Sequence, residues 1–430
     1  MNRAVYPVAV AVAIRVALAP FFMHAWDMTT LMTASQQFLS GVNPYTYVQQ
    51  QAALQQAATG LPLPFYGFAY TATTLLVYAP FYWAYHALGF APLPLTGWQL
   101  QPGQALGLVY PAAFYFLLLM KIPVIAADAA VVYLLYKRAP RLGWVYALSP
   151  YVIVITSLWG NFDPLIGLFL LIAYLAFDRS KLLSGFVFGL SMMKVYTVVA
   201  TPAFLLAIGK KPRDLASFLV GAAVAQIPSA YYLAADPSSF LYALGFQASR
   251  PANGVNIYYA LIELRSIYLE ISAANLVSAV FVASLAVATY AMWRSKTGLK
   301  ESIVLLMLVY IVFAPVTNEQ LLAAVIPIGL LCRNFSHKLT VFPLVYIMFN
   351  ATYFYFATPL FFQTPALIAV YNSLNGWWGG IVGSYIIQAR YLVGAAMGVS
   401  ALVLARSTFE GPLRLRVTLP KLALPRRGAD

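Results

Sequence analysis

Uninterrupted apolar runs of about 20 residues recur along this sequence, and each is long enough to cross the hydrocarbon core of a bilayer as a helix. In such a core the backbone must satisfy its own hydrogen bonds, so only helices and closed barrels span membranes. A barrel would show short alternating segments instead of continuous apolar runs. With 62% hydrophobic and 9% charged residues, the chain is predicted to be an all-α, polytopic membrane protein.

We predict about ten spans, with interfacial helices between residues 24 and 104 and a possible re-entrant pair at 182–208. Segment 68–90 is expected to lie along the outer interface or to dip in and return, because the basic residues Lys137, Arg138 and Arg141 then fall on the cytosolic side. The predicted spans are about 4–23, 105–136, 142–159, 164–178, 214–234, 271–293, 301–316, 319–332, 338–357 and 383–405.

The basic residues predict the orientation of these spans. The chain has 26 Lys and Arg residues and a formal net charge of +14. The topology above places most of them in cytosolic segments, as the positive-inside rule requires, and both termini are then cytosolic. The charge therefore reports membrane topology, and nucleic acid is not an expected partner.

Residues 1–405 are predicted to form one membrane domain, because no composition shift or flexible linker divides them. Residues 406–430 form a separate basic, cytosolic tail, which either lies on anionic headgroups or only keeps the protein soluble. Cys332 is the only cysteine, so stability must come from helix packing instead of disulfides. Small-xxx-small pairs, interpreted as close helix contacts, are Gly185/Gly189, Gly376/Gly380 and Gly379/Gly383.

Asp27 follows the first predicted span, in the segment His24-Ala25-Trp26-Asp27, and opens a long external loop rich in polar and aromatic residues. A partly desolvated carboxylate at the boundary of water and lipid can accept a proton from an acceptor hydroxyl. Asp27 is therefore the candidate general base. Because it stands at the start of a helical stretch, a helix N-cap is the alternative interpretation.

The turn Trp159-Gly160-Asn161-Phe162-Asp163-Pro164 is expected on the same external side. It could bring Asn161 and Asp163 towards a bound sugar, although Asn and Asp are also ordinary turn residues. Arg250 and Arg265 are the only cations in the predicted external loops. A guanidinium binds phosphate in bidentate fashion, so we assign Arg250 to a lipid-linked phosphate and Arg265 to pairing with a carboxylate.

Lys121 and Asp128 are seven residues apart in one predicted span, about 10 Å along the helix axis, too far for direct pairing. Ionisable groups inside a membrane suggest a function. With Lys194, expected at the elbow of the re-entrant pair, they raise a second hypothesis, a transporter or lipid flippase with an intramembrane relay. Such proteins show repeated halves, and the sequence contains no repeat of fixed period.

Several familiar chemistries are absent from the sequence. It has no glycine-rich Walker loop, no HExxH helix and no cysteine pair. These absences disfavour a nucleotide-hydrolysing pump. A soluble nucleotide sugar would also be a poor donor for a site that faces away from the cytosol, so a membrane-borne donor is expected.

The chain resembles the GT-C superfamily of polytopic glycosyltransferases, particularly the catalytic subunit of GPI mannosyltransferase I and related polyprenyl-phosphate-dependent mannosyltransferases. The resemblance covers most of residues 1–330. Its parts are an acidic residue after the first helix followed by Gly41-Val42-Asn43-Pro44-Tyr45; Lys121 with Asp128 and Tyr136; Ser149-Pro150; Gly160-Asn161 with Asp163; Lys194-Val195-Tyr196; Arg250 with Asn253; and Asn318-Glu319-Gln320.

The resemblance implies inverting transfer of a hexose, with mannose expected, from a polyprenyl (dolichyl) phosphate sugar to a lipid-linked or glycan acceptor. Asp27 would be the base, and the resemblance implies no cofactor. The family typically carries an Asp-x-Asp pair in the first external loop, whereas Ala25 stands at the first position here, which leaves a divalent metal uncertain. A small accessory membrane subunit is a possible partner. Expected substrate-binding residues are His24, Tyr45, Asn161, Asp163, Lys194, Arg250, Asn253, Glu319 and Gln320.

Overall fold

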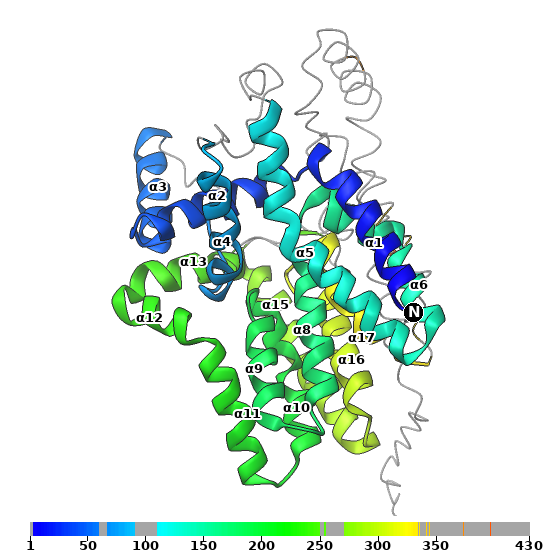
Figure 1. Ribbon diagram of the computed structural model, residues 1–430. Helices are drawn as coiled ribbons and strands as arrows, with labels where there is room; N and C mark the ends of the chain where they lie inside the picture. The colour runs from blue at the N-terminus through cyan, green and yellow to red at the C-terminus, as the bar shows by residue number, and fades with distance from the viewer. Residues whose placement is uncertain are drawn as a thin grey trace, which may run out of the picture.

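The structure is a computed structural model that describes residues 3–59, 67–90, 110–249, 253–254 and 271–333, together with isolated positions further along the chain. Within these ranges the protein is mostly helical (Figure 1), which confirms the predicted all-α class. Arg250, Arg265, the tail 406–430 and, apart from isolated positions, the predicted spans 338–357 and 383–405 lie outside the described residues.

The N-terminal part consists of α1 (Val5–Leu18), η1 (Ala19–Phe21), α2 (Ala25–Leu39), α3 (Pro44–Thr59), α4 (Thr73–Ala87) and the long α5 (Tyr110–Arg138). The middle part consists of α6 (Pro140–Ala147), α7 (Pro150–Ile153), η3 (Val154–Trp159), α8 (Asp163–Ala176), α9 (Lys181–Ser191), η4 (Val195–Ala200), α10 (Thr201–Ile208), α11 (Pro212–Ala225), α12 (Ile227–Ala235) and α13 (Pro237–Ser249). It is followed by α15 (Ile271–Ser295), α16 (Leu299–Phe313), η5 (Glu319–Leu321) and α17 (Leu322–Gly329). Two short parallel strands, β1 (Asn253–Gly254) and β2 (Val316–Thr317), pair with Asn253 opposite Val316.

Two helices among the described residues are long and apolar enough to cross a membrane, Phe114–Arg138 and Leu276–Ser295. The number rises to four if each of two bent pairs is one span, Pro140–Ala147 with Pro150–Trp159 and Pro212–Ala225 with Ile227–Ala235. Several other predicted spans are shorter helices of 10–17 residues, below the length of about 20 residues that a simple span needs. Length and composition therefore support fewer spans than the ten predicted, because irregular turns such as η1 end the helices early.

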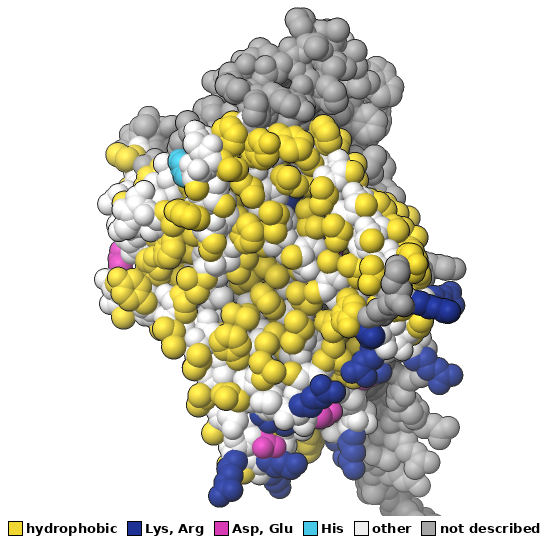
Figure 2. Space-filling model, viewed as in Figure 1, with side chains coloured by type: hydrophobic (Ala, Val, Ile, Leu, Met, Phe, Trp, Pro, Cys, Tyr) yellow, Lys and Arg dark blue, Asp and Glu magenta, His cyan; other side chains and the backbone are white. Residues whose placement is uncertain are grey.

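Along the chain, turns with exposed Lys and Arg residues alternate with turns that carry uncharged polar or acidic residues. Exposed Lys and Arg side chains lie at one set of helix ends and in the turns that connect them. The other set of helix ends includes the segments Ala19–Phe21, Trp159–Asp163 and Met193–Val195. Figure 2 shows a broad hydrophobic face with Lys and Arg side chains gathered along its lower and right-hand edges. The exposed basic residues are Arg3, Lys137, Arg138, Arg141, Arg179, Lys210, Lys211, Arg213, Arg294, Lys296 and Arg333.

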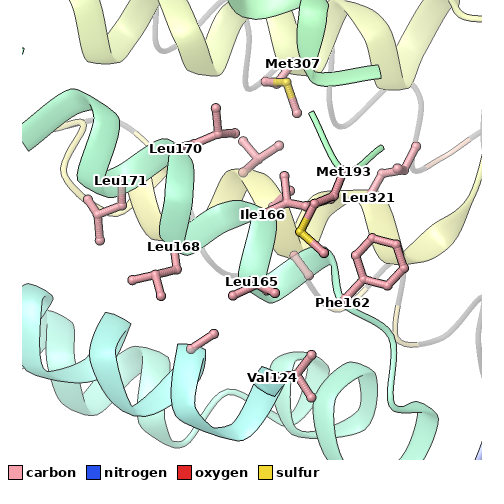
Figure 3. Packing of buried hydrophobic residues seen from close by; sticks show 14 of the residues in the cluster. Val124, Phe162, Leu165, Ile166, Leu168, Leu170, Leu171, Met193, Met307 and Leu321 are labelled. Atoms are coloured by element: carbon pink, nitrogen blue, oxygen red, sulfur yellow. The ribbon is translucent and has the colours of Figure 1, made fainter. Parts of the chain in front are cut away.

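Helix α8 lies at the centre of the hydrophobic core, packed between α5, α9 and α17. Four of its leucines, Leu165, Leu168, Leu170 and Leu171, are buried together with Ile166. Phe162, Met193 and Leu321 come from three separate segments and meet near the start of α8 (Figure 3). Because these residues are buried in the core, their polar neighbours Asn161, Asp163 and Lys194 are held close to one another.

Helices α9 and α11 pack through glycines, which confirms the packing interpretation of Gly185 and Gly189. A Cβ atom at Gly185 would overlap the carbonyl oxygen of Phe218, and one at Gly189 would lie 2.7 Å from that of Ala222. Backbone-to-backbone contact of this kind leaves no space for a side chain.

Gly185→Ala is expected to destabilise the protein by about 1–3 kcal/mol, because the added methyl group must push α11 away from α9. The measurement is thermal unfolding of the purified protein in lipid nanodiscs. Gly245→Ala is the matched control, since nothing lies within 4 Å of a Cβ atom at that position in α13. Equal unfolding temperatures for the two variants would contradict the prediction.

Candidate active site

Asp27 lies in the first turn of α2 and is 4% exposed. Its Oδ2 atom accepts hydrogen bonds from Trp159 Nε1 at 2.6 Å and Asn161 Nδ2 at 3.0 Å, and its Oδ1 atom accepts one from the Tyr70 hydroxyl at 3.2 Å. These donors come from two segments remote from α2 in sequence. The tertiary fold, rather than the local helix, therefore surrounds this carboxylate with donors.

His24 stands at the N-cap position of α2, so Asp27 is not the N-cap residue. The Nδ1 atom of His24 lies 3.1 Å from Asp27 Oδ2 and 3.4 Å from the backbone nitrogen of Asp27. A single ring nitrogen cannot donate to the carboxylate and accept from the amide at once, and the shorter contact favours donation to the carboxylate. The imidazole also lies against the Trp159 indole, with ring centroids 4.5 Å apart.

The turn that delivers Trp159 and Asn161 depends on Gly160. The preceding segment η3 is a π-helix, and the backbone N–H groups of Gly160 and Asn161 both donate to the Ile155 carbonyl. π-Helical turns often occur at functional sites. Gly160 has φ +82°, and a Cβ atom there would lie 2.7 Å from Met28 Cε and 2.8 Å from Lys121 Cε. Only glycine fits this conformation and this space.

Asn161 joins Asp27 to a second buried carboxylate, Asp163. The Asn161 Oδ1 atom accepts from the Asp163 backbone N–H at 3.0 Å and from Lys194 Nζ at 3.2 Å. Lys194 also forms a 2.8 Å ion pair with Asp163 Oδ2, and the Tyr196 hydroxyl donates to Asp163 Oδ1 at 2.5 Å. Two carboxylates and one ammonium group thus share a continuous hydrogen-bonded network.

The network keeps Asp27 ionised. Burial raises the pKa of its carboxyl group, but the charges of His24 and Lys194 and the donated hydrogen bonds outweigh burial and hold the pKa well below its usual range. Burial and the charges of Asp27 and Asp163 raise the pKa of Tyr70 well above its usual value, so Tyr70 stays a hydroxyl donor. A carboxylate that stays ionised at neutral pH can accept a hydrogen bond from a hydroxyl nucleophile and so orient it.

Tyr45 contacts the site indirectly, through Tyr70. Its side chain is fully buried, its hydroxyl donates to the Tyr70 carbonyl at 2.8 Å, and its ring packs against Phe68, Tyr232 and Phe240. The structure therefore places Tyr45 as a residue that positions Tyr70, instead of one in direct contact with Asp27.

Glu319 and Gln320 lie at the same end of the bundle and are buried. The Glu319 carbonyl accepts from the Tyr151 hydroxyl at 2.6 Å. The pairing of β1 with β2 brings the backbone of Asn253 alongside Val316, three residues before Glu319. The two predicted loop segments are thus adjacent, while Arg250 lies outside the described residues.

Lys121 and Asp128 do not meet Lys194. Lys121 Nζ donates to the carbonyls of Ala19 at 2.8 Å, Ser157 at 2.6 Å and Phe22. Asp128 pairs with Arg15 at 2.5 Å and accepts from the Tyr146 hydroxyl at 2.7 Å. Each group is satisfied by its own local partners.

Three contributors to the site were not assigned a role from the sequence: Tyr70, Trp159 and Tyr196. Trp159 and Tyr196 belong to motifs that were singled out, so adjacency to Asn161 and Lys194 was a usable signal. Tyr70 carries no such signal, because its segment was predicted only as interfacial.

Among the residues that the structure describes, no group of three or more His, Cys, Asp or Glu side chains is placed to hold a metal ion. The Asp163 carboxylate is occupied by Lys194. No protein-family model matches the chain, and no curated protein and no solved structure matches it.

Proposed function

We propose that this protein is an integral-membrane glycosyltransferase. It transfers a hexose, with mannose the expected sugar, from a polyprenyl-phosphate donor to a lipid-linked or glycan acceptor on the extracytosolic face. The observation that carries the proposal is the buried network of Asp27, Asn161, Asp163 and Lys194 at the helix ends opposite the basic turns.

The orientation follows from the positive-inside rule, which places the basic turns in the cytosol. Lys121 contacts the carbonyls of Ala19 and Ser157 at the site. Along α5 it lies about 25 Å from Arg138 at the basic end. A hydrocarbon core is about 30 Å thick, so the site lies close to the outer boundary. In this proposal the shorter apolar helices complete the membrane bundle of about ten spans.

In the proposed reaction the acceptor hydroxyl oxygen attacks the anomeric carbon of the donor sugar and inverts it. The bond from that carbon to the phosphate oxygen breaks, and the phosphate leaves with the electron pair. The hydroxyl proton goes to the Asp27 carboxylate. Arg250 is proposed as the partner of the phosphate, because a guanidinium can neutralise the leaving group by bidentate hydrogen bonding.

The transporter hypothesis has less support. A relay needs Lys121, Asp128 and Lys194 to exchange protons or a solute, whereas Lys121 binds three carbonyls and Asp128 binds Arg15. Lys194 pairs with Asp163 instead. Ionisable side chains inside a membrane pair with one another or with backbone carbonyls, and in this proposal these pairs have a structural role.

The test is transfer of labelled mannose by the purified protein in nanodiscs, from a short-chain polyprenyl-phosphate mannose to an extracted membrane-lipid acceptor. The expected product is a labelled glycolipid, and GDP-mannose should give none. Transfer from GDP-mannose, or the absence of product with every polyprenyl-phosphate hexose tested, would contradict the proposal.

A further inference from the structure

Unpaired buried hydroxyl groups gather beside the candidate active site. Nine buried polar side-chain atoms in the described part of the chain have no hydrogen-bond partner. Five of the nine lie in α2 or in the stretch that leads into and includes α4, two segments that pack against each other. Native proteins leave few buried polar groups unpaired, so such a concentration needs an explanation. The five residues are Thr29, Ser35, Thr71, Thr74 and Tyr78.

Three of these residues form what we name the hydroxyl row: Thr71, Thr74 and Tyr78. Thr74 and Tyr78 are four residues apart on one face of α4. Thr71 precedes the helix, and its carbonyl accepts from the Thr74 backbone N–H at 3.0 Å. The ring centroid of Tyr78 lies 6.0 Å from that of Phe162. Phe162 is the residue between Asn161 and Asp163. The backbone N–H of Thr71 donates to the Met193 carbonyl, next to Lys194. The row therefore borders the carboxylate network at both ends.

The charges of the site reach this row. Burial and the charges of Asp27 and Asp163 raise the pKa of Tyr78 well above its usual value. Tyr78 is therefore a neutral hydroxyl group within the electrostatic field of both carboxylates. A hydroxyl group in this position can donate to one ligand oxygen and accept from another.

Two other hydroxyl groups of α4, one of them a turn beyond Tyr78 on the same face, are paired. Thr73 Oγ1 donates to the Ala225 carbonyl at 3.2 Å, and the Tyr82 hydroxyl lies 3.2 Å from His86 Nε2. The unpaired groups are thus the ones nearest the site in this segment, because Thr71 contacts Met193 and Tyr78 contacts Phe162.

We infer that the hydroxyl row binds the hydroxyl groups of a hexose, the sugar of the donor in the function proposed above, on which this inference rests. The row carries no formal charge, and hydroxyl groups that both donate and accept match a neutral polyol better than a phosphate. Its three oxygen atoms are sealed from solvent, so the structure is a closed arrangement.

The experiment compares two pairs of variants, Thr74→Val against Thr73→Val and Tyr78→Phe against Tyr82→Phe. Thermal unfolding is recorded in nanodiscs without ligand, with methyl α-mannoside and with short-chain polyprenyl-phosphate mannose, always without acceptor. Thr74→Val and Tyr78→Phe should unfold at the wild-type temperature or above it without sugar, because their hydroxyl groups have no partner to lose. Each should weaken the sugar affinity about tenfold, the effect of one lost hydrogen bond.

The control variants should behave in the opposite way, with a lower unfolding temperature and unchanged sugar affinity. If Thr74→Val and Tyr78→Phe lower the unfolding temperature without sugar as much as their controls do, the hydroxyl groups have structural partners such as bound water, and the inference is wrong. It is also wrong if neither probe stabilises the wild type. Sugar binding without transfer would overturn only the proposed function, and transfer with normal affinity in both row variants would overturn only this inference.

Discussion

Lys194→Met is expected to destabilise the protein by about 3–5 kcal/mol, because it leaves the Asp163 carboxylate buried without its cation. Asp163 is fully buried, and the Lys194 side chain is 10% exposed, so solvent screens this 2.8 Å pair little. Asn161 also loses a donor. The measurement is thermal or denaturant-induced unfolding in nanodiscs, compared with the wild type.

Two further variants separate the lost pair from a general effect of removing a lysine. Asp163→Asn combined with Lys194→Met removes both charges and should recover most of the lost stability, since no uncompensated charge remains. Lys210→Met removes an exposed lysine and should change stability by less than about 0.5 kcal/mol. A double variant as unstable as Lys194→Met would show that the ion pair is not the cause.

Asp27→Ala is expected to abolish transfer and to destabilise the site, whereas Asp27→Asn should abolish transfer alone. Alanine removes the carboxylate oxygen to which Trp159 Nε1 and Asn161 Nδ2 donate, and losing such an acceptor costs about 1–3 kcal/mol for a buried donor. An asparagine can keep its amide oxygen towards these two donors and donate its NH2 group to the oxygen of Tyr70. The measurement is unfolding temperature and initial transfer rate for both variants.

The sequence predicted which turns lie at one end of the bundle, because apolar length and the positive-inside rule together set the direction of each helix. It placed Asp27 and the turn of Asn161 and Asp163 on the same side, and it placed Lys194 at a break, where α9 gives way to η4. These predictions need only the order of spans and turns. The substrate roles assigned to these residues stay predictions.

The sequence could not predict the partners of the charged groups. Lys121 looked like part of a relay because charges within spans are often functional. In the structure, η1 and η3 interrupt their helices and free carbonyl groups, and Lys121 donates to three of these. Unsatisfied carbonyls are costly in an apolar interior, so a lysine there can be structural. Hydropathy does not reveal such helix breaks. For the same reason, the hydropathy pattern predicted ten spans where the structure has several shorter helices.

Tyr70 shows the other limit of the sequence. Its hydroxyl reaches Asp27 across 43 positions of chain, and its backbone is held by Tyr45 and by the packing around Phe68. No local pattern signals a contact of this kind. The tertiary fold creates it, by placing the segment that precedes α4 beside α2.

The most direct test of the central claim is the initial rate of mannose transfer from short-chain polyprenyl-phosphate mannose by wild type and Asp27→Asn. Thermal unfolding should first show that the two proteins have the same unfolding temperature. We expect product from the wild type and a rate at least about 10²-fold lower from the variant, the loss typical of removing a general base. Equal rates would show that the Asp27 carboxylate is not the base. The absence of product from folded wild type would contradict the proposed transfer itself.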